Sequence, residues 1–431
     1  MAPGHVDVHV ARGPDGTIRI AAGPGPRPIE VHDGVVHVGP DFTRAVLDVA
    51  GAVLTWPVLD APGLPWAEVH DVGRAQQWVW ALYGERVAAA VHDSAAGRGG
   101  VRVTAEATAL AGAAARLGLG HWAARWWPAS YQDGIPVLEP SLLGLELAAL
   151  THRCQQLFDD EGDQPDDCAA ELIEEHLAAL DPLIQWWRAT AGSVDMARRL
   201  ETVLRLIDDA ADNAGLDGPA LRHLRSSLEG RGPAAASADP GALFARRGGY
   251  ALAAGEPLVT GGRVIARGSG INDWRRYPPG LVDAAESAVS WTARALGARR
   301  RIEVEALADP AAPATGTPLV AEVHVNGGAP HRVSLARRDD LWTGHSDLSP
   351  DPQAGVSAPR IEVGVLLPGF DPGPGAPGDA DVRAGRDAVR ALVRRRLAVA
   401  RRPPAYDTPP HDNCSAPFLA ETAATATDED Y

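Results

Sequence analysis

Val289-Ser-Trp-Thr-Ala-Arg294 is followed by Ile302-Glu-Val-Glu-Ala306, and these two stretches decide the fold of the C-terminal half of the chain. Apolar and polar side chains alternate in both, which is the period of a β-strand with one buried face. Four further short stretches before residue 368 continue the alternation, and Asn326-Gly327-Gly328 predicts a hairpin turn between two of them. Strands at this spacing without helices between them predict an antiparallel β-sandwich over residues 241–370.

The N-terminal half has a different pattern. Turn signals at Pro14-Asp15-Gly16 and Asp33-Gly34 predict two hairpins, so residues 1–40 are expected to form a small β-meander. Residues 41–230 are predicted to form an α-helical domain, with Asp41 as its first N-cap. The predicted helices cover residues 41–55, 70–92, 104–127, 139–159, 167–190, 194–214 and 217–229.

Three shorter segments complete the predicted α+β chain. Residues 231–240 are small and polar, which is typical of a linker. Residues 381–402 predict one basic helix after the β-sandwich. Residues 403–431 are rich in Pro, Thr and Ala and end in acidic residues, so they are predicted to be a disordered tail.

The composition excludes several function classes. The formal net charge of −16 over 431 residues argues against a nucleic-acid partner, which needs a basic surface. All 40 basic residues are arginine, so a lysine Schiff base or a P-loop lysine is excluded. Three cysteines, no signal-peptide pattern and no long apolar run predict a cytoplasmic protein without a membrane span.

Asp208-Asp209-Ala-Ala-Asp212 spells DDxxD on a predicted helix. In isoprenoid synthases such a run binds magnesium and diphosphate, and Asp208 and Asp212 share a helix face, so chelation is geometrically possible. Those enzymes also need a second acidic motif, which this chain lacks. An acidic, solvated helix end is the simpler interpretation, and a metal-dependent helical enzyme is kept as an alternative function.

His152, Cys154, Cys168 and His176 are residue types that bind zinc. Their spacing matches no recognised zinc pattern, and Cys154 lies in an apolar helical stretch where cysteine usually acts as a small hydrophobe. A zinc-binding module is therefore the second alternative. The chain has no G-x-S-x-G, Walker A or G-x-G-x-x-G motif, and no cofactor is predicted.

The aromatic run from His121 to Trp127 is the most unusual local feature. Trp122 and Trp126 share one helix face, and His121 and Arg125 share another. An aromatic and guanidinium cluster could bind a ligand or a partner. Packing in the core is the favoured interpretation, because the chain has 12 tryptophans but only 5 phenylalanines and 6 tyrosines, so tryptophan supplies most of its large aromatic side chains.

The segment GHWAARWWPASYQDGIP, residues 120–136, resembles a stretch in uncharacterised actinobacterial proteins encoded with MoxR-type AAA ATPases and von Willebrand A proteins. The resemblance extends over the helical half at most. It implies an accessory or adaptor component of an ATPase-centred system, and it assigns no catalytic residue.

The helix predicted over residues 381–402 places Arg386, Arg390 and Arg394 on one basic face, together with Arg383. Val389, Val393 and Leu397 form an apolar stripe. Such a helix could bind an acidic partner, but docking on the β domain with the arginines in water is the simpler interpretation.

The leading functional prediction is a non-catalytic interaction or adaptor protein of a bacterial cytosol, with a protein partner. It rests on the absence of a catalytic motif from the sequence. It also rests on an analogy of fold, because β-sandwiches often serve as recognition modules.

Overall fold

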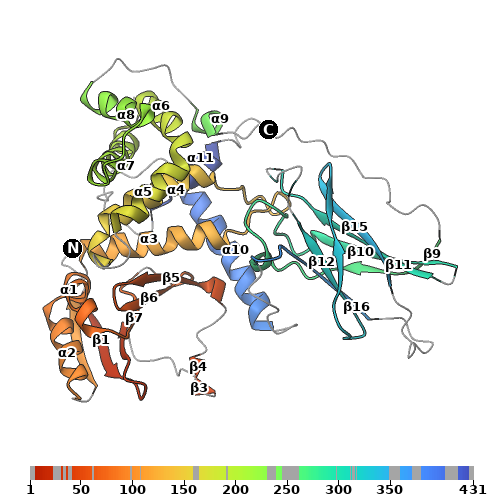
Figure 1. Ribbon diagram of the computed structural model, residues 1–431, viewed down its shortest axis with the longest axis horizontal. Helices are drawn as coiled ribbons and strands as arrows, with labels where there is room; N and C mark the ends of the chain where they lie inside the picture. The colour runs from red at the N-terminus through yellow and green to blue at the C-terminus, as the bar shows by residue number, and fades with distance from the viewer. Residues whose placement is uncertain are drawn as a thin grey trace. The chain divides into compact units, whose positions relative to one another are not determined.

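The computed structural model describes residues 5–22, 31–32, 35–36, 41–60, 63–97, 100–106, 108–158, 165–190, 193–230, 239–244, 262–297, 299–310, 312, 316, 318–348, 360–370, 380–402 and 416–426. Helices and antiparallel sheets are both present, so the α+β fold class is confirmed (Figure 1). No helix in this part of the chain combines the length and apolar character that crossing a membrane requires.

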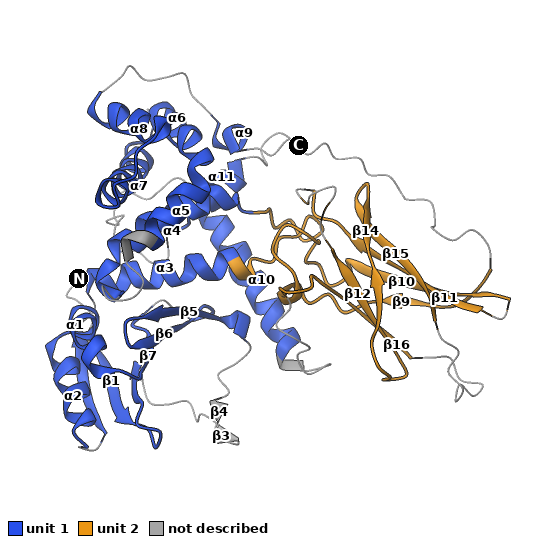
Figure 2. Cartoon of the chain, viewed as in Figure 1, with its two compact units in different colours: residues 1–124, 138–245, 380–431 blue, residues 125–137, 246–379 orange. Residues whose placement is uncertain are grey.

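The chain divides into two compact units, coloured separately in Figure 2. Unit 1 contains residues 1–124, 138–245 and 380–431, and unit 2 contains residues 125–137 and 246–379. The boundary after residue 245 lies just beyond the predicted linker, of which residues 231–238 are outside the described part. Each unit takes residues from both sides of that linker, so neither unit is one continuous stretch of sequence.

Unit 1 contains a six-stranded antiparallel sheet with the strand order β5-β6-β7-β2-β1-β8. The predicted first hairpin is confirmed, because β1 pairs with β2 and buries Val8, Val10, Ile18 and Ile20 on one face. The second hairpin, β3 with β4, is also confirmed. The strands are β1 (His5–Arg12), β2 (Ile18–Ala22), β3 (Val31–His32), β4 (Val35–Val36), β5 (Arg44–Val49), β6 (Ala52–Pro57), β7 (Trp66–Val69) and β8 (Val101–Glu106).

The helix predicted over residues 41–55 is wrong. Asp41–Thr43 form a short 3-10 turn, and β5 and β6 then form an antiparallel hairpin. The burial of β5 alternates strictly between buried and accessible residues, which is a strand period that a short apolar run conceals. Gly51 makes the turn at φ 71°, and an added Cβ would lie 2.4 Å from the Asp71 carbonyl oxygen, so the turn requires glycine.

The helices of unit 1 follow the other predicted segments, with two of those segments divided. Gly84 separates α1 from α2, and η3 (Leu177–Ala179) separates α5 from α6. The first residues of the segment predicted from 104 belong instead to β8. The helices are α1 (Val72–Tyr83), α2 (Glu85–Ala95), α3 (Ala109–Trp126), α4 (Pro140–Arg153), α5 (Pro165–His176), α6 (Leu180–Ala189), α7 (Val194–Asn213), α8 (Pro219–Glu229), α9 (Pro240–Phe244), α10 (Ala380–Ala400) and α11 (Leu419–Ala426).

Helix α3 carries small, apolar side chains on nearly every side. This composition is typical of a helix that is buried between two layers. Gly118 faces the sheet, where an added Cβ would lie 3.2 Å from the Trp56 ring. Gly120 faces the opposite layer, where an added Cβ would lie 2.5 Å from Leu147 of α4 and 3.4 Å from the Phe418 ring. The missing side chains therefore let two layers approach α3 closely.

The disordered tail predicted for residues 403–431 is wrong for residues 416–426. Phe418 and Leu419 are completely buried, and α11 contacts α4 and α10 within unit 1. The predicted basic helix after the β domain is confirmed as α10, although it belongs to unit 1. The composition of the tail suggested disorder because its few anchoring residues are separated by small and polar ones.

Unit 2 contains two antiparallel sheets that contact each other, with the orders β14-β15-β11-β10-β9 and β13-β12-β16. The alternation that predicted them is confirmed, because Trp291 pairs with Val304 and Ala293 with Ile302, all on the buried face. The strands are β9 (Arg263–Ser269), β10 (Val289–Leu296), β11 (Arg299–Leu307), β12 (Val320–Val325), β13 (His331–Ser334), β14 (Ala336–Arg338), β15 (Leu341–Leu348) and β16 (Ile361–Leu366).

Asp283 holds the segment of residues 125–137 within unit 2. Its buried carboxylate accepts hydrogen bonds from Ser130 Oγ at 2.7 Å and from the backbone N–H groups of Tyr131, Gln132 and Ala285 at 2.7, 3.2 and 2.8 Å. Buried Asn272 donates to the Asp283 carbonyl oxygen at 2.8 Å. This network satisfies a buried charge with four donors, as burial of a carboxylate requires.

Candidate functional site

The most developed polar site of unit 1 surrounds the N-terminus of α11. Glu146 of α4 is only 2% exposed. Its Oε2 accepts hydrogen bonds from the backbone N–H groups of Leu419 at 2.6 Å and Ala420 at 3.3 Å. These N–H groups have no partner inside the helix, and the helix dipole favours a negative charge at this end. Glu146 therefore caps α11 from a different helix.

Glu421 completes the cap from within α11. Its Oε2 accepts the backbone N–H of Phe418 at 2.5 Å, three residues earlier, which is the return bond of a capping box. Both of its carboxylate oxygens also accept hydrogen bonds from Arg396 of α10, each at 2.7 Å. This two-point geometry is the strong form of an arginine–carboxylate pair, and Glu421 is completely buried in it.

Three arginines donate hydrogen bonds to the backbone carbonyl oxygens just before α11. Arg116 of α3 donates to the carbonyl oxygens of Ala416 at 2.8 Å and Pro417 at 3.1 Å. Arg199 of α7 also donates to the Pro417 carbonyl, and Arg396 donates to that of Ala416 at 3.3 Å. We call these three arginines, together with Glu146, the arginine clamp.

The ring of Phe418 lies between two guanidinium groups of the clamp. Arg116 lies 4.7 Å and Arg396 5.5 Å from the ring centroid, which is cation–π distance. The ring is 1% exposed and lies against Gly120, where no side chain intervenes. The clamp thus recognises an aromatic ring, two carbonyl oxygens and a carboxylate of one short segment.

The charges of this site are unbalanced. Arg116, Arg199 and Arg396 face Glu146 and Glu421, so one positive charge is in excess among these five. Burial, followed by the neighbouring charge of Arg199, lowers the pKa of Arg116 to about 10. The excess explains why the segment presents backbone carbonyl oxygens to the arginines, since these carry the partial negative charge that the site still needs.

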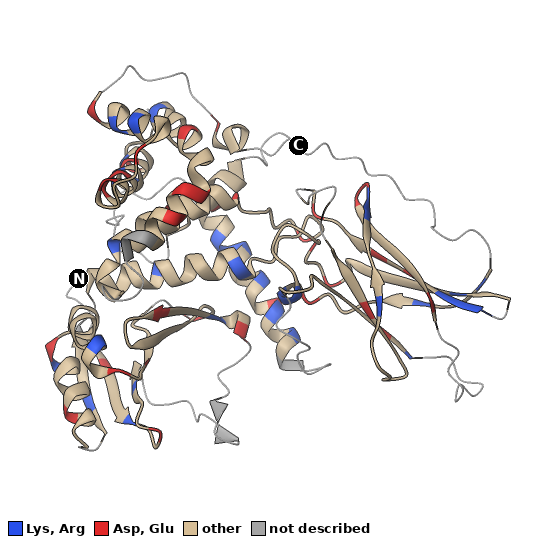
Figure 3. Cartoon of the chain, in the orientation of Figure 1, with Lys and Arg blue, Asp and Glu red and all other residues tan. Residues whose placement is uncertain are grey.

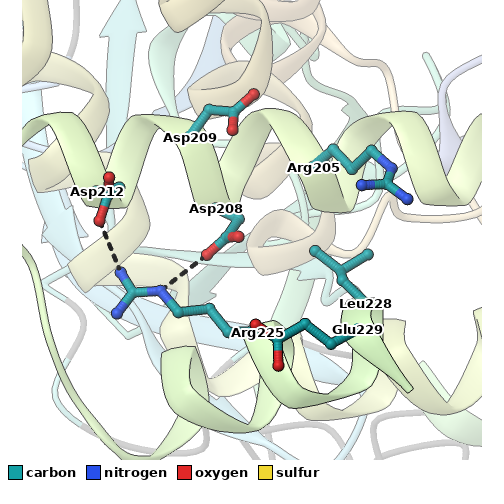
Figure 4. A pocket seen from close by; sticks show the side chains of 7 residues that line it. All are labelled: Arg205, Asp208, Asp209, Asp212, Arg225, Leu228 and Glu229. Carbon is teal, nitrogen blue, oxygen red and sulfur yellow. Dashed lines mark hydrogen bonds and ion pairs between the residues drawn. The ribbon is translucent and has the colours of Figure 1, made fainter.

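The Asp208 run lines a pocket of about 540 Å³ between α7 and α8 (Figure 4). Asp208 and Asp212 turn toward Arg225, whose Nε lies 3.1 Å from Asp208 and whose Nη2 lies 3.7 Å from Asp212, while Asp209 points away. An arginine therefore occupies the position between the carboxylates that a magnesium ion would take. Among the described residues, no group of three or more His, Cys, Asp or Glu side chains could hold a metal ion.

The four residues of the zinc alternative have different environments. Cys154 is buried, Cys168 is exposed and His152 is half-buried. The His176 ring lies against Gly144 of α4, where an added Cβ would approach to 1.8 Å. Burial raises the pKa of the Cys154 thiol to about 12. Cys154 is therefore packed as a small buried side chain, as its apolar helical stretch predicted.

We expect Cys154 to resist thiol reagents in the folded protein. Burial raises the pKa of its thiol to about 12, so the thiol is not ionised near neutral pH, and the thiolate is the reactive form. In a Cys414→Ser background, a maleimide should modify Cys168 rapidly and Cys154 only on unfolding. Mass spectrometry would show which cysteine carries the label, and fast labelling of Cys154 would contradict its burial.

The aromatic run is divided between the two units. Trp122 is buried in unit 1, where its Nε1 donates to the Phe42 carbonyl at 2.7 Å. Trp127 is buried in unit 2 and donates to the Pro136 carbonyl at 2.9 Å. The core interpretation is confirmed for these two tryptophans. His121 is exposed and Trp126 is half-buried.

Arg125 has a structural contact within unit 2. Its guanidinium lies 3.4 Å from the Phe370 ring centroid and 4.7 Å from that of Trp126, and it donates to the Phe370 carbonyl at 3.2 Å. Arg125 and Trp126 therefore contribute to the packing of unit 2, whereas Trp122 is buried in unit 1.

Trp127→Ala should cost about 3–5 kcal/mol of stability in unit 2, as for other buried large aromatic residues. Trp126→Ala should cost clearly less, because the Trp126 side chain keeps partial contact with solvent in the folded protein. Urea denaturation of both variants would measure the difference. Equal losses would show that Trp126 is as much a core residue as Trp127.

The basic face predicted on α10 is only partly exposed (Figure 3 shows the basic residues along this helix). Arg386 and Arg390 are each only 4% exposed, whereas Arg394 is exposed. The prediction of one solvated face is therefore wrong, because the helical steps that align these arginines also bring Arg386 and Arg390 beside buried Val389 and Val393. Arg396, which the sequence analysis did not select, makes the charged contact with α11.

Comparisons with known proteins identify no relative of this chain. No model of a protein family, no curated protein and no solved structure matches the chain. The function is therefore argued from the geometry of the chain itself.

Proposed function

We propose that the chain is a non-catalytic interaction protein, an adaptor, which recognises short helical segments of proteins. The observation that carries this proposal is the arginine clamp around residues 416–421. A short helix in a groove, with a buried aromatic anchor and an arginine–carboxylate pair, is a recurring mode of peptide recognition. Buried aromatic and arginine side chains of this kind also contribute most of the binding energy at many protein interfaces.

The partner we propose is a protein in a bacterial cytosol. The net charge of −16 disfavours nucleic acid as the partner. The resemblance of residues 120–136 adds the narrower proposal that the partner belongs to a MoxR-type AAA ATPase system.

Purification of the tagged full chain from its host, with cross-linking before lysis, would test the proposal. We expect one protein to co-purify in near-stoichiometric amount and to bind again after both proteins are purified separately. Failure of the purified pair to bind would contradict the adaptor function.

Thermal unfolding with added metal separates the enzyme and zinc alternatives from an adaptor. A ligand at 100 times its Kd stabilises the folded state that binds it by about 2.7 kcal/mol. We expect neither magnesium with diphosphate nor zinc to raise the Tm. A magnesium effect lost in Asp208→Asn would favour the metal-dependent enzyme, and a zinc effect lost in Cys168→Ser would favour the zinc module.

A further inference from the structure

The segment that fills the clamp is short and depends on the groove for its structure. Helix α11 has 8 residues, and isolated helices shorter than about 12–15 residues are marginal in water. The stabilising contacts therefore come from outside it, mainly from Arg116, Glu146 and Arg396. The helix behaves energetically as a ligand that is attached to its receptor.

Each position of the segment meets a distinct requirement of the groove. Pro417 needs no hydrogen-bond acceptor, because it has no N–H, and its carbonyl accepts from two arginines. Phe418 fills the space beside Gly120, and Leu419 is completely buried. Glu421 binds Arg396 through both oxygens. The groove formed by the arginine clamp and Gly120 therefore fits the pattern Pro-aromatic-Leu-x-Glu at the start of a helix.

The clamp also requires an acidic occupant. Without residues 416–426, three arginines would face Glu146 alone, an excess of two positive charges among these four residues. Guanidinium groups without a carboxylate partner attract one, and the two-point arginine–carboxylate pair is the strong form, so a carboxylate ligand is favoured.

We propose that this groove binds a helix of a partner protein that carries Pro-aromatic-Leu-x-Glu, and that residues 416–426 occupy it as a built-in competitor. The proposal rests on the adaptor function and names the class of ligand. The segment belongs to the same chain as the groove, so a partner helix must bind more tightly than the attached α11 to displace it.

A labelled synthetic peptide of residues 415–431 is the probe, and fluorescence anisotropy with the full chain is the measurement. Phe418→Ala removes the anchor of the attached segment and leaves the groove residues unchanged. We expect this variant to bind the peptide at least about tenfold more tightly than the wild type, because the competitor is weakened. Ala424→Ser, at a half-buried position of α11 that makes none of the clamp contacts, is the matched control and should behave like the wild type.

A second peptide with glutamine in place of Glu421 tests the chemistry of recognition. It should compete at least about tenfold more weakly, because an amide cannot pair with Arg396 through two acceptor oxygens. Equal competition by both peptides would overturn the assigned carboxylate requirement.

Two outcomes would overturn the proposal as a whole. One is a folded Phe418→Ala protein, shown by circular dichroism, that binds no peptide at concentrations up to 1 mM. The other is loss of unit 1 structure in this variant and also in a full chain cut at a protease site placed within residues 403–415, which would make α11 an obligatory part of the core. If a partner still co-purifies in either case, the adaptor function stands and uses a different surface.

Discussion

Replacing Glu146 with glutamine is expected to lower the free energy of unfolding of unit 1 by about 3–5 kcal/mol, the cost of leaving buried charges without their partner. The amide can accept at one oxygen only, so its NH2 group would face donors either from Arg116 and Arg199 or from the first turn of α11. Hydrogen exchange should show the amides of Leu419 and Ala420 losing protection first, because Glu146 is their acceptor.

Glu201→Gln is the matched control for this prediction. Glu201 pairs with Arg205 one turn away at 2.7 Å, but both side chains are well exposed, so the loss should be about 0.3–0.5 kcal/mol. Urea denaturation that finds the two variants equally stable would show that the contacts of Glu146 contribute no more than a surface pair.

Replacing Asp283 with alanine should destabilise unit 2 by about 4 kcal/mol. Hydrogen bonds to charged groups contribute about 1.5–3 kcal/mol each, although four that share one carboxylate are not additive. Ser130 Oγ and the N–H groups of Tyr131 and Gln132 would lose their acceptor, so residues 125–137 should detach first. Limited proteolysis should then cut near Tyr131, which is already 59% exposed.

Asp347→Asn provides the comparison in the same unit. Asp347 pairs with Arg301 at 2.7 Å and is 46% exposed, so its loss should cost less than about 1 kcal/mol. An Asp283→Ala protein as stable as Asp347→Asn, with residues 125–137 still resistant to protease, would show that the hydrogen bonds do not hold this segment.

The parts of the fold that the sequence predicted are those where one period extends over a whole element. Val289 to Arg294 and Ile302 to Ala306 alternate in sequence, and they pair at the centre of a unit 2 sheet. The prediction failed for residues 44–57, because two short strands joined at Gly51 form one apolar run. In so short a run the helix period and the strand period cannot be told apart. Local pattern also cannot show that α10 and α11 complete a unit begun near residue 5.

The clamp was not predictable from motifs, because its residues extend from Arg116 to Arg396 and no spacing relates them. Two local signals existed. Glu146 interrupts the apolar run of α4, and a buried charge of this kind requires partners. Phe418 and Glu421 have the spacing of a capping box. The Asp208 motif was visible locally, but Arg225, which neutralises it, lies on the next helix and outside the motif.

Because both units are discontinuous in sequence, parts of unit 1 are synthesised before most of unit 2 and the rest after it. Strand β8 ends at Glu106 and α11 begins at Leu419, so roughly 15–60 s of synthesis separates them at about 5–20 residues per second. Arg116, Glu146 and Arg199 are translated within that interval, before the helix that contacts them. All of unit 2 emerges in the same interval, before residues 380–431 can complete unit 1. The clamp is therefore complete only after Arg396 and residues 416–426 have followed unit 2 in synthesis, so the core of unit 1 closes after unit 2 has been made.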